Sequence, residues 1–434
     1  MMVWRLAFRN LVRNGWRTGL TAGGIAVAVA LLIFLSAWIT GMARTMVASA
    51  TEAGVGHVLV EAAVGEEAHT LHDAFAVDEA QLDAIAASPL VERVAPRIES
   101  FGLLGDEERS QVVRVSGVDP VREGGASSVF ARSMREGEWF GAQAPSETGP
   151  REVVLGHGLA QVLRVGVGDE LVFFTQAADG SLGNDVARVR GIVRTGQSAV
   201  DRMTVFFHLE DARWLLALEG QAHQLVVLTP SVYGVVQQAE VLAAHVGEVL
   251  GLPVHRAHGP ESTDGVVLRT WGEVAPMLAE MVDLTDAMAW IFYFVLFFLA
   301  GFGIVNTQRM SVLERRREFG ILLAVGMRAR LLAKMIVAET VLLGLVGALA
   351  GLVLGVGVTA LFGHVGIDFS VFTAYEGDIE VLGLQLGEPM YPRVSDARVA
   401  LPVVVIGLLS AFFALPAALR TLRLDAVRAI SGRT

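Results

Sequence analysis

The 434-residue chain contains no cysteine and only one lysine, Lys334. Without thiols it cannot form disulfides, zinc–thiolate sites or a cysteine nucleophile. A phosphate-binding P-loop requires Gly-Lys followed by Ser or Thr, whereas Lys334 stands between Ala333 and Met335. The sequence therefore carries no such nucleotide site. We expect no cofactor in this chain, and any ATP-driven function would use a separate ATPase that binds the ATP and magnesium.

Charged residues are also scarce. They make up 18% of the chain, and hydrophobic residues make up 53%, whereas a soluble domain carries about 25% charged residues. We therefore expect lipid to solvate part of the protein. A helix of about 20 apolar residues crosses the hydrocarbon core of a bilayer. Four segments meet this requirement, namely residues 18–41, 288–307, 335–362 and 399–419.

The first apolar segment has a second interpretation as a signal peptide, because it follows a basic arm and precedes Ala48-Ser49-Ala50. Its apolar core, residues 20–40, is 21 residues long, which is longer than the roughly 7 to 15 apolar residues of a signal peptide. Arg44 also separates this core from the candidate cleavage site. We therefore expect an uncleaved membrane anchor.

Charge sets the orientation of the predicted helices. Residues 1–19, 308–334 and 420–434 together carry 15 positive and 3 negative charges, and the rest of the chain has a net charge of −23. Positive segments remain on the cytoplasmic side of a membrane. We therefore predict a multi-pass membrane protein with both termini in the cytoplasm. Residues 42–287 and 363–398 are then extracytoplasmic.

Residues 42–287 have the sequence pattern of a folded domain with both strands and helices. Strand-like runs rich in β-branched residues alternate with helical patterns, which favours an α+β domain, with two subdomains expected. The predicted fold is thus an integral membrane protein with four transmembrane helices and a large α+β domain inserted between the first two. The predicted strands are residues 57–60, 112–118, 170–174, 189–193 and 225–228, and the predicted helices are 78–87, 209–218 and 235–250.

Two cytoplasmic pieces offer surfaces for contact. Residues 1–17 form a basic amphipathic pattern, which predicts either a helix in the membrane interface or a topology signal with no further role. Residues 308–334, which we call the coupling segment, read as a short charged helix and a turn that lead into the third span. This segment is either a docking surface for another protein or a solvated connection. The tail, residues 420–434, is basic.

The third span contains one acid and a regular set of glycines. An acid within a membrane span is a functional candidate, but Glu339 lies close to the helix start and could instead reach water or Lys334. Gly347, Gly351 and Gly355, here called the glycine stripe, recur every four residues. Such a stripe permits close helix packing, either within the chain or between subunits.

The sequence gives only weak signals for chemistry. His69 and His72 lie near Asp73, and His255 and His258 are three residues apart, but both pairs stand in polar, loop-like stretches. The chain also lacks the G-x-S-x-G motif of a serine hydrolase. We therefore expect neither a metal site nor a catalytic residue, and we do not expect an enzyme.

The coupling segment and third span read SVLERRREFGILLAVGMRARLLAKMIVAETVLLGLVGALAGLVLG from Ser311. This sequence closely resembles the FtsX/MacB superfamily of ABC transporter permeases. In that family the second span is followed by E-R-x-x-E-[FI]-G-[IV], then A-x-G, a basic stretch, an early acid in the third span and a Gly-rich helix. The matching residues are Glu314, Arg315, Glu318, Phe319, Gly320, Ile321, Ala324, Gly326, Glu339 and the glycines through Gly355.

The resemblance extends over most of the chain. The opening WRLAFRNLVRNGWRTGL and the pair Asn306-Thr307 are similar to the family's own, and EGEWF, EVVLGHGLAQVLRVGVGDEL, VRGIVRTG and Asp201 resemble a MacB-type periplasmic core domain. Two features depart from the family pattern. Ala426 replaces the usual Pro near the C-terminus, and the loop 363–398 is longer than in compact members.

The resemblance implies a permease that works as a dimer with a second permease chain, the same or homologous, and two copies of a cytoplasmic ABC ATPase. Movement of the first two spans would carry ATP-driven work to the outside domain, a behaviour called mechanotransmission. The LolC/LolE-like branch implies a lipoprotein substrate and a periplasmic chaperone or adaptor. Export of peptides or small molecules and FtsX-like regulation of a cell-wall hydrolase are the alternatives. The resemblance also implies a location in the bacterial inner membrane, with the large domain periplasmic. Lipid bilayer, but no nucleic acid, is an expected partner. The implied ATPase-coupling residues are Glu314, Arg315, Arg316, Arg317, Glu318, Phe319, Gly320 and Gly326.

Overall fold

The computed structural model divides the chain into two compact units, one helical and one α+β. The helical unit takes its residues from 1–44, 281–369 and 389–434, and the α+β unit takes its residues from 45–280 and 370–388. The structure describes residues 7–9, 11, 13, 15–64, 70–142, 149–256, 264–367, 380–381, 384–385, 391–393 and 396–422.

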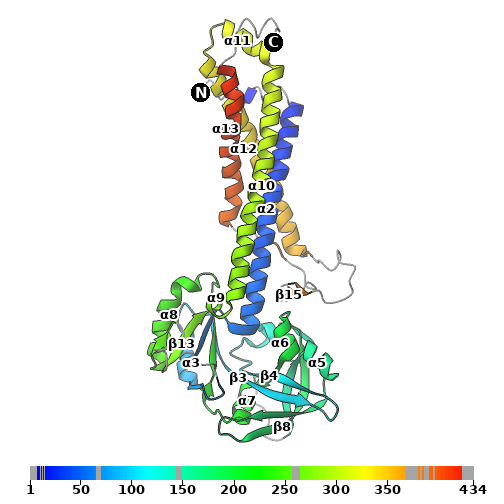
Figure 1. The fold of residues 1–434 in the computed structure, drawn as a ribbon, viewed down its shortest axis with the longest axis vertical. Helices are drawn as coiled ribbons and strands as arrows, with labels where there is room; N and C mark the ends of the chain where they lie inside the picture. Colours follow the sequence, from blue (N-terminus) through cyan, green and yellow to red (C-terminus); the bar gives the residue numbers. More distant parts are fainter. Residues whose placement is uncertain are drawn as a thin grey trace. The chain divides into compact units, whose positions relative to one another are not determined.

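Four long apolar helices, each of sufficient length and hydropathy to cross a membrane, are found among the described residues. They confirm the predicted transmembrane fold. Helix α10 is longer than the predicted second span, because it begins with Pro276 and continues to Glu314. Proline suits the first position of a helix, since the N–H group that it lacks has no partner there. The helices are α2 (Gly15–Ala50), α10 (Pro276–Glu314), the short α11 (Arg316–Ala324), α12 (Ala329–Val365) and α13 (Asp396–Leu422), as Figure 1 shows.

The helical unit has an apolar core to which all four long helices contribute. Membrane helices associate through close van der Waals packing, because lipid is as apolar as their side chains. Small and β-branched residues accordingly fill the centre. The buried members of this core are Ile25, Val29 and Ile33 of α2, Ala300 and Ile304 of α10, Ala348 of α12 and Ile406 of α13.

The α+β unit is built on one large sheet. Its strand order is β12-β13-β1-β11-β3-β4-β9-β6-β8-β5, and β7 pairs with both β3 and β8. The strands are β1 (Val58–Ala62), β3 (Arg93–Gly105), β4 (Ser110–Val118), β5 (Met134–Gly137), β6 (Arg151–Gly156), β7 (Glu170–Gln176), β8 (Leu182–Val193), β9 (Thr204–His208), β11 (Gln224–Leu228), β12 (Val254–His255) and β13 (Val266–Thr270). Two small pairs, β2 (Phe75–Ala76) with β10 (Gln221–Ala222) and β14 (Glu380–Val381) with β15 (Leu384–Gln385), are separate.

Helices cover the two ends of this sheet. Helices α3 and α8 pack together near β13, and α5, α6 and α7 pack against β4, β6 and β9. The first turn after α2 is a π-helical segment, η1 (Thr51–Val55), and a short 3-10 turn is η2 (Gly125–Ser127). The helices are α3 (Glu79–Ala86), α4 (Val129–Arg132), α5 (His157–Leu163), α6 (Ser198–Met203), α7 (Leu209–Leu216), α8 (Val235–Leu250) and α9 (Trp271–Val274).

The predicted strands and helices of the outside domain are confirmed, and the structure adds strands that the sequence did not indicate. All five predicted strand runs lie in β1, β4, β7, β8 and β11, and the three predicted helices are α3, α7 and α8. The added strands include β6 and β9, which are central in the sheet and have most of their residues buried. A strand buried on both faces has no polar alternation, so its apolar run is ambiguous in a sequence.

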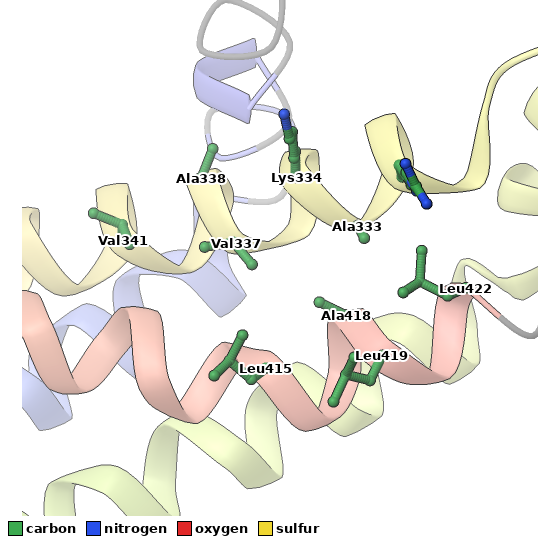
Figure 2. Close-up of a pocket in the computed structure, with 10 residues that line it drawn as sticks. Ala333, Lys334, Val337, Ala338, Val341, Leu415, Ala418, Leu419 and Leu422 are labelled. Carbon is green, nitrogen blue, oxygen red and sulfur yellow. The ribbon is translucent and has the colours of Figure 1, made fainter.

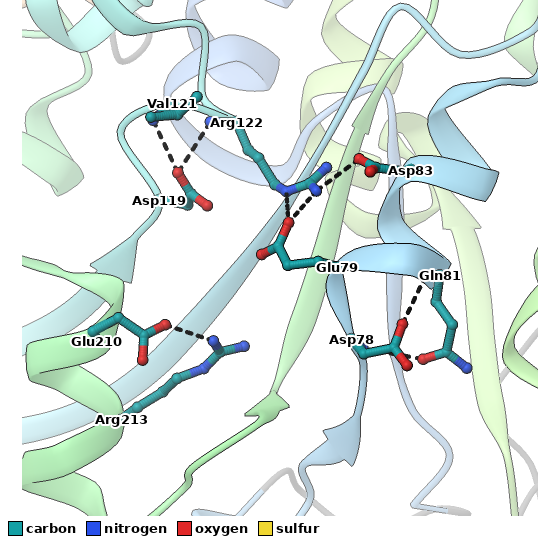
Figure 3. Close-up of polar contacts among 9 residues, drawn as sticks. All are labelled: Asp78, Glu79, Gln81, Asp83, Asp119, Val121, Arg122, Glu210 and Arg213. Carbon is teal, nitrogen blue, oxygen red and sulfur yellow. Dashed lines mark hydrogen bonds and ion pairs between the residues drawn. The ribbon is translucent and has the colours of Figure 1, made fainter. Parts of the chain in front are cut away.

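Local polar contacts fix the start of α3. Asp78 accepts a hydrogen bond from the backbone N–H of Gln81 at 2.7 Å, and the Gln81 side chain accepts one from the backbone N–H of Asp78 at 3.1 Å. This reciprocal pair is a capping box, which satisfies two backbone donors at a helix start. Arg122, from the loop after β4, forms ion pairs with Glu79 and with Asp83 one turn further along. Figure 3 shows how these contacts fasten the loop to the helix.

Some of the sequence predictions lie outside the described residues. They include most of the arm 1–17, most of the loop 363–398, and the tail 420–434 beyond Leu422. His69 and His258 are also outside. Their predicted roles stay predictions.

Candidate functional site

The middle of the coupling segment forms a separate short helix, α11, between the end of α10 and the start of α12. Helix α10 ends at Glu314, the chain turns at Arg315, and α11 begins at Arg316. After α11 the backbone turns back through Gly326, whose φ of +101° is a conformation that side chains with a Cβ rarely adopt. Gly326 therefore ends α11 and directs the chain into α12.

The predicted intramembrane acid has a specific partner. One guanidinium nitrogen of Arg315, Nη1, donates to both carboxylate oxygens of Glu339 at 3.1 Å. Both side chains are largely buried, with 12% and 15% of their areas exposed. Glu339 is therefore paired with Arg315, and this ion pair connects the N-terminal end of α11 to α12.

The same arginine also contacts α11. Its Nε donates to Glu318 at 3.1 Å, and its guanidinium lies 5.1 Å from the centre of the Phe319 ring. Glu318 further accepts a hydrogen bond from Arg13 at 3.3 Å. Exposed ion pairs contribute little to stability, so the largely buried pair with Glu339 is the main polar link.

The buried side of α11 is apolar and anchors the segment. Phe319 is 1% exposed and Gly320 is also buried. Phe319 packs against α12 and α13, and burying a phenylalanine contributes about 2 to 3 kcal/mol. Phe319 and Gly320 therefore act as structural anchors of the segment. The buried partners of Phe319 are Leu332, Met335 and Ile336 of α12 and Ala417 of α13.

The opposite side of α11 is exposed. It presents Arg317 and Ile321, and Val325 follows directly as the C-cap residue of the helix. We call these three residues, which recur every four positions, the docking face. Ile321 is 49% exposed and Val325 is 83% exposed. These two exposed aliphatic side chains beside charged residues make the docking face a candidate for contact with a protein. The apolar character of this face was not part of the predicted site, and only the four-residue spacing in the sequence could have indicated it.

The glycine stripe packs against α2 of the same chain. A Cβ atom added at Gly351 would lie 2.5 Å from the carbonyl oxygen of Ala26, and one at Gly347 would lie 2.9 Å from that of Ala22. At Gly355 the nearest atom is the Cα of Ala30, at 3.0 Å. Small residues on both helices thus allow the two backbones to approach closely. Of the two predicted uses of the stripe, the structure supports packing within the chain.

The described residues contain no group of three or more His, Asp or Glu side chains arranged to hold a metal ion. His157 contacts the side chain of Gln161 at 3.0 Å, on the next turn of α5. His255 contacts the backbone oxygen of Asp264 at 3.0 Å. These histidines have local structural partners.

One buried carboxylate of the α+β unit is unusual in its protonation. Asp211 in α7 accepts a hydrogen bond from Arg151 through Oδ1, and among the described residues its buried Oδ2 has no hydrogen-bond partner. Burial raises the pKa of Asp211 to about 6, although Arg151 opposes the shift. In an unfolded chain the pKa of an aspartate is about 3.9. The folded domain therefore binds this proton more tightly than the unfolded chain does.

This difference predicts a pH effect on stability. The stabilising contribution is fully present below about pH 4 and is lost as the pH rises through about 6. We expect the thermal unfolding midpoint of the Asp211→Asn variant of the full chain to fall less between pH 4 and pH 7 than that of the wild type. Glu248→Gln removes one exposed charge from α8 and serves as the control. Parallel profiles for Asp211→Asn and wild type would contradict the assignment.

Comparison with known families places the chain. A model of the MacB-like periplasmic core domain matches residues 18–244, and a model of the FtsX-like permease C-terminal region matches residues 290–426. The first match alone spans more than half of the chain. The protein belongs to the FtsX/MacB superfamily of ABC transporter permeases, and it is a multi-pass membrane protein with a MacB-type periplasmic α+β domain between its first helix and the remaining three.

The individual relatives that match this chain have low sequence identity to it. The chain is 26% identical over 270 residues to the lipoprotein-releasing system transmembrane protein LolC of Neisseria meningitidis serogroup B, which covers 60% of each protein. It is 24% identical over 380 residues to the macrolide export ATP-binding/permease protein MacB of Agrobacterium fabrum, covering 85% of this chain and 54% of that protein. The periplasmic region of MacB from Actinobacillus actinomycetemcomitans aligns with 52% of this chain and 94% of its own, with 9% identity and a TM-score of 0.34.

Proposed function

We propose that this chain is the membrane subunit of an ABC transporter that works by mechanotransmission, and that a separate cytoplasmic ATPase drives it through α11. The docking face is the observation that carries this proposal. Arg317 and Ile321 lie on the outer side of α11, and Val325 lies directly after it. The inner side of this helix is held by Phe319 and by the Arg315–Glu339 pair. Exposed aliphatic residues on a firmly held helix suit a partner protein that pushes or pulls on it.

A second chain completes the proposed transporter. Two copies of the ATPase would bind two permease chains, the same or homologous, and nucleotide binding would bring the cytoplasmic ends of the helices together. Several large side chains on one side of α10 are exposed within the predicted second span, where either lipid or the second chain would cover them. The exposed residues are Trp290, Ile291, Phe294, Phe298, Leu299 and Phe302.

The proposed substrate is a lipoprotein that the transporter releases from the inner membrane. The similarity to a protein named as part of a lipoprotein-releasing system supports this substrate. Depletion of the chain in cells should then leave lipidated outer-membrane proteins in the inner membrane, where fractionation and immunoblotting would detect them. Normal sorting of lipoproteins after depletion would contradict lipoprotein release.

Export of a small molecule is the second candidate, and the similarity to macrolide export proteins favours it. The same depletion strain separates the two candidates. If the chain is an exporter, depletion should increase the sensitivity to macrolides and leave lipoprotein sorting normal. If it is a releasing permease, depletion should leave lipoproteins in the inner membrane without a specific change in macrolide sensitivity.

The proposed topology can be tested by labelling, since the chain has no cysteine of its own. A cysteine at Glu108, whose side chain is 78% exposed in the α+β unit, should react with a membrane-impermeant maleimide on intact spheroplasts. A cysteine at the exposed Arg317 should react only after permeabilisation. The positive charge around α11 is the reason for this expectation. The reverse pattern would overturn the topology.

A further inference from the structure

An apolar groove lies between the start of α12 and the end of α13. It has a volume of about 650 Å³. Ala333 and Ala418 are small, so the surface between the two helices is hollow there (Figure 2), and Ala338 also lines the groove. The other lining residues are Arg330, Lys334, Val337 and Val341 of α12 and Leu415, Leu419 and Leu422 of α13.

The wall formed by α13 is apolar and open. Leu415 is 45% exposed, Leu419 is 58% exposed and Leu422 is 41% exposed. They lie on one side of α13, because residues three and four apart share a helix face. Such a surface is stable only where apolar matter covers it.

Two basic residues lie at the end of the groove where α12 begins. Arg330 and Lys334 are four residues apart, so they share one face of α12, and both are exposed. Within the part of the chain that the structure describes, neither forms an ion pair, and the nearby acid Glu339 is bound by Arg315. The groove therefore combines an apolar trough with a cationic end.

The change from cationic to apolar coincides with the expected membrane boundary. The predicted third span begins at residue 335, directly after Lys334. From Lys334 to Val341 the helix rises about 10 Å. This length matches the part of an acyl chain that lies nearest to the phosphate. Arg330 and Lys334 are then at the depth of lipid phosphates, and the trough is at the depth of the hydrocarbon.

We propose that this groove binds one anionic phospholipid from the leaflet next to α11. The phosphate interacts with Arg330 and Lys334, and one acyl chain lies between α12 and α13 along Val337, Val341 and Leu419. Basic side chains at a membrane surface attract anionic lipids, and ammonium and guanidinium groups form charge-assisted hydrogen bonds with phosphate oxygens. The proposed topology enters only in naming this leaflet as the cytoplasmic one.

Native mass spectrometry of the full chain tests the proposal. The protein would be reconstituted in nanodiscs with equal amounts of phosphatidylglycerol and phosphatidylcholine of the same acyl chains, then transferred to mild detergent. We expect one phosphatidylglycerol to be retained in preference to phosphatidylcholine. Each basic residue near an anionic lipid is worth about fivefold in affinity. Arg330→Gln should therefore lower the preference about fivefold, and Arg330→Gln with Lys334→Gln should abolish it.

Two further variants separate the site from general effects. Leu419→Trp fills the trough at an exposed position and should reduce retention of both lipids. Arg309→Gln removes one exposed positive charge from α10, away from the groove, and should leave the preference unchanged. Equal retention of the two lipids by the wild type, or an unchanged preference in the double variant, would overturn the proposal. No ATPase or substrate takes part, so this result is independent of lipoprotein release.

Discussion

Leucine in place of Gly351 is expected to prevent the helical unit from assembling correctly. Even a Cβ at this position would lie 2.5 Å from the carbonyl oxygen of Ala26 and 2.7 Å from the Cβ of Val29. The first contact is with backbone, which cannot move aside as a flexible side chain can. Helix α2 would have to shift away from α12, and overpacking of this kind costs about 3 kcal/mol or more. The yield of monodisperse protein in detergent and its thermal unfolding midpoint would measure the loss.

Gly357 provides the matched control on the same helix. A Cβ at this position meets no atom within 4 Å. Gly357→Leu should be at least as stable as the wild type, because glycine costs about 1 kcal/mol in a helix interior relative to a good helix former. If Gly351→Leu behaved like Gly357→Leu, the assignment of the glycine stripe to the α2 contact would be wrong.

Aspartate at both Ile321 and Val325 is expected to separate the chain from its ATPase. The two side chains are exposed, so the substitutions should not disturb the fold. Burying them in an interface contributes about 1.4 kcal/mol each, and their replacement by charges should weaken ATPase binding about 100-fold. Binding of the purified ATPase to the chain in nanodiscs, followed by biolayer interferometry, would measure this loss.

The control places aspartate at two exposed valines of the α+β unit. Val121 and Val236 are 57% and 63% exposed, and aspartate at these two positions should leave ATPase binding unchanged.

The predicted coupling residues can be tested in the same assay. Lysine at both Glu314 and Glu318 should also weaken binding, whereas equal binding by all three variants would argue against a docking role for α11.

The sequence predicted the membrane helices well, because their signal is local. A span is visible as an uninterrupted apolar run, and the inserted domain was visible as alternating strands and helices. The polar first turns of α10 were not visible, since Glu280, Asp283 and Asp286 resemble the outside domain that precedes them. Hydropathy alone cannot separate a polar helical extension from a loop.

The motif indicated the candidate site residues, but the directions of their side chains were not predictable. Glu339 lies closer in sequence to Lys334 than to Arg315, and only the turn at Gly326 brings Arg315 to it. Similarly, the predicted coupling residues included Phe319 and left out Ile321. The structure buries the first and exposes the second, because α11 begins at Arg316 after a break in the helix and this break sets its rotation.

Turnover of the partner ATPase tests the central claim most directly. The candidate ABC ATPase would be added to nanodiscs that contain the wild-type chain, the Ile321→Asp and Val325→Asp double variant, or no chain. We predict that the ATPase binds the wild-type chain and that its rate of ATP hydrolysis then differs from its rate with empty nanodiscs. With the double variant the rate should equal that with empty nanodiscs. The chain alone should hydrolyse no ATP. Equal turnover in all three preparations, or hydrolysis by the chain alone, would contradict a permease coupled through α11.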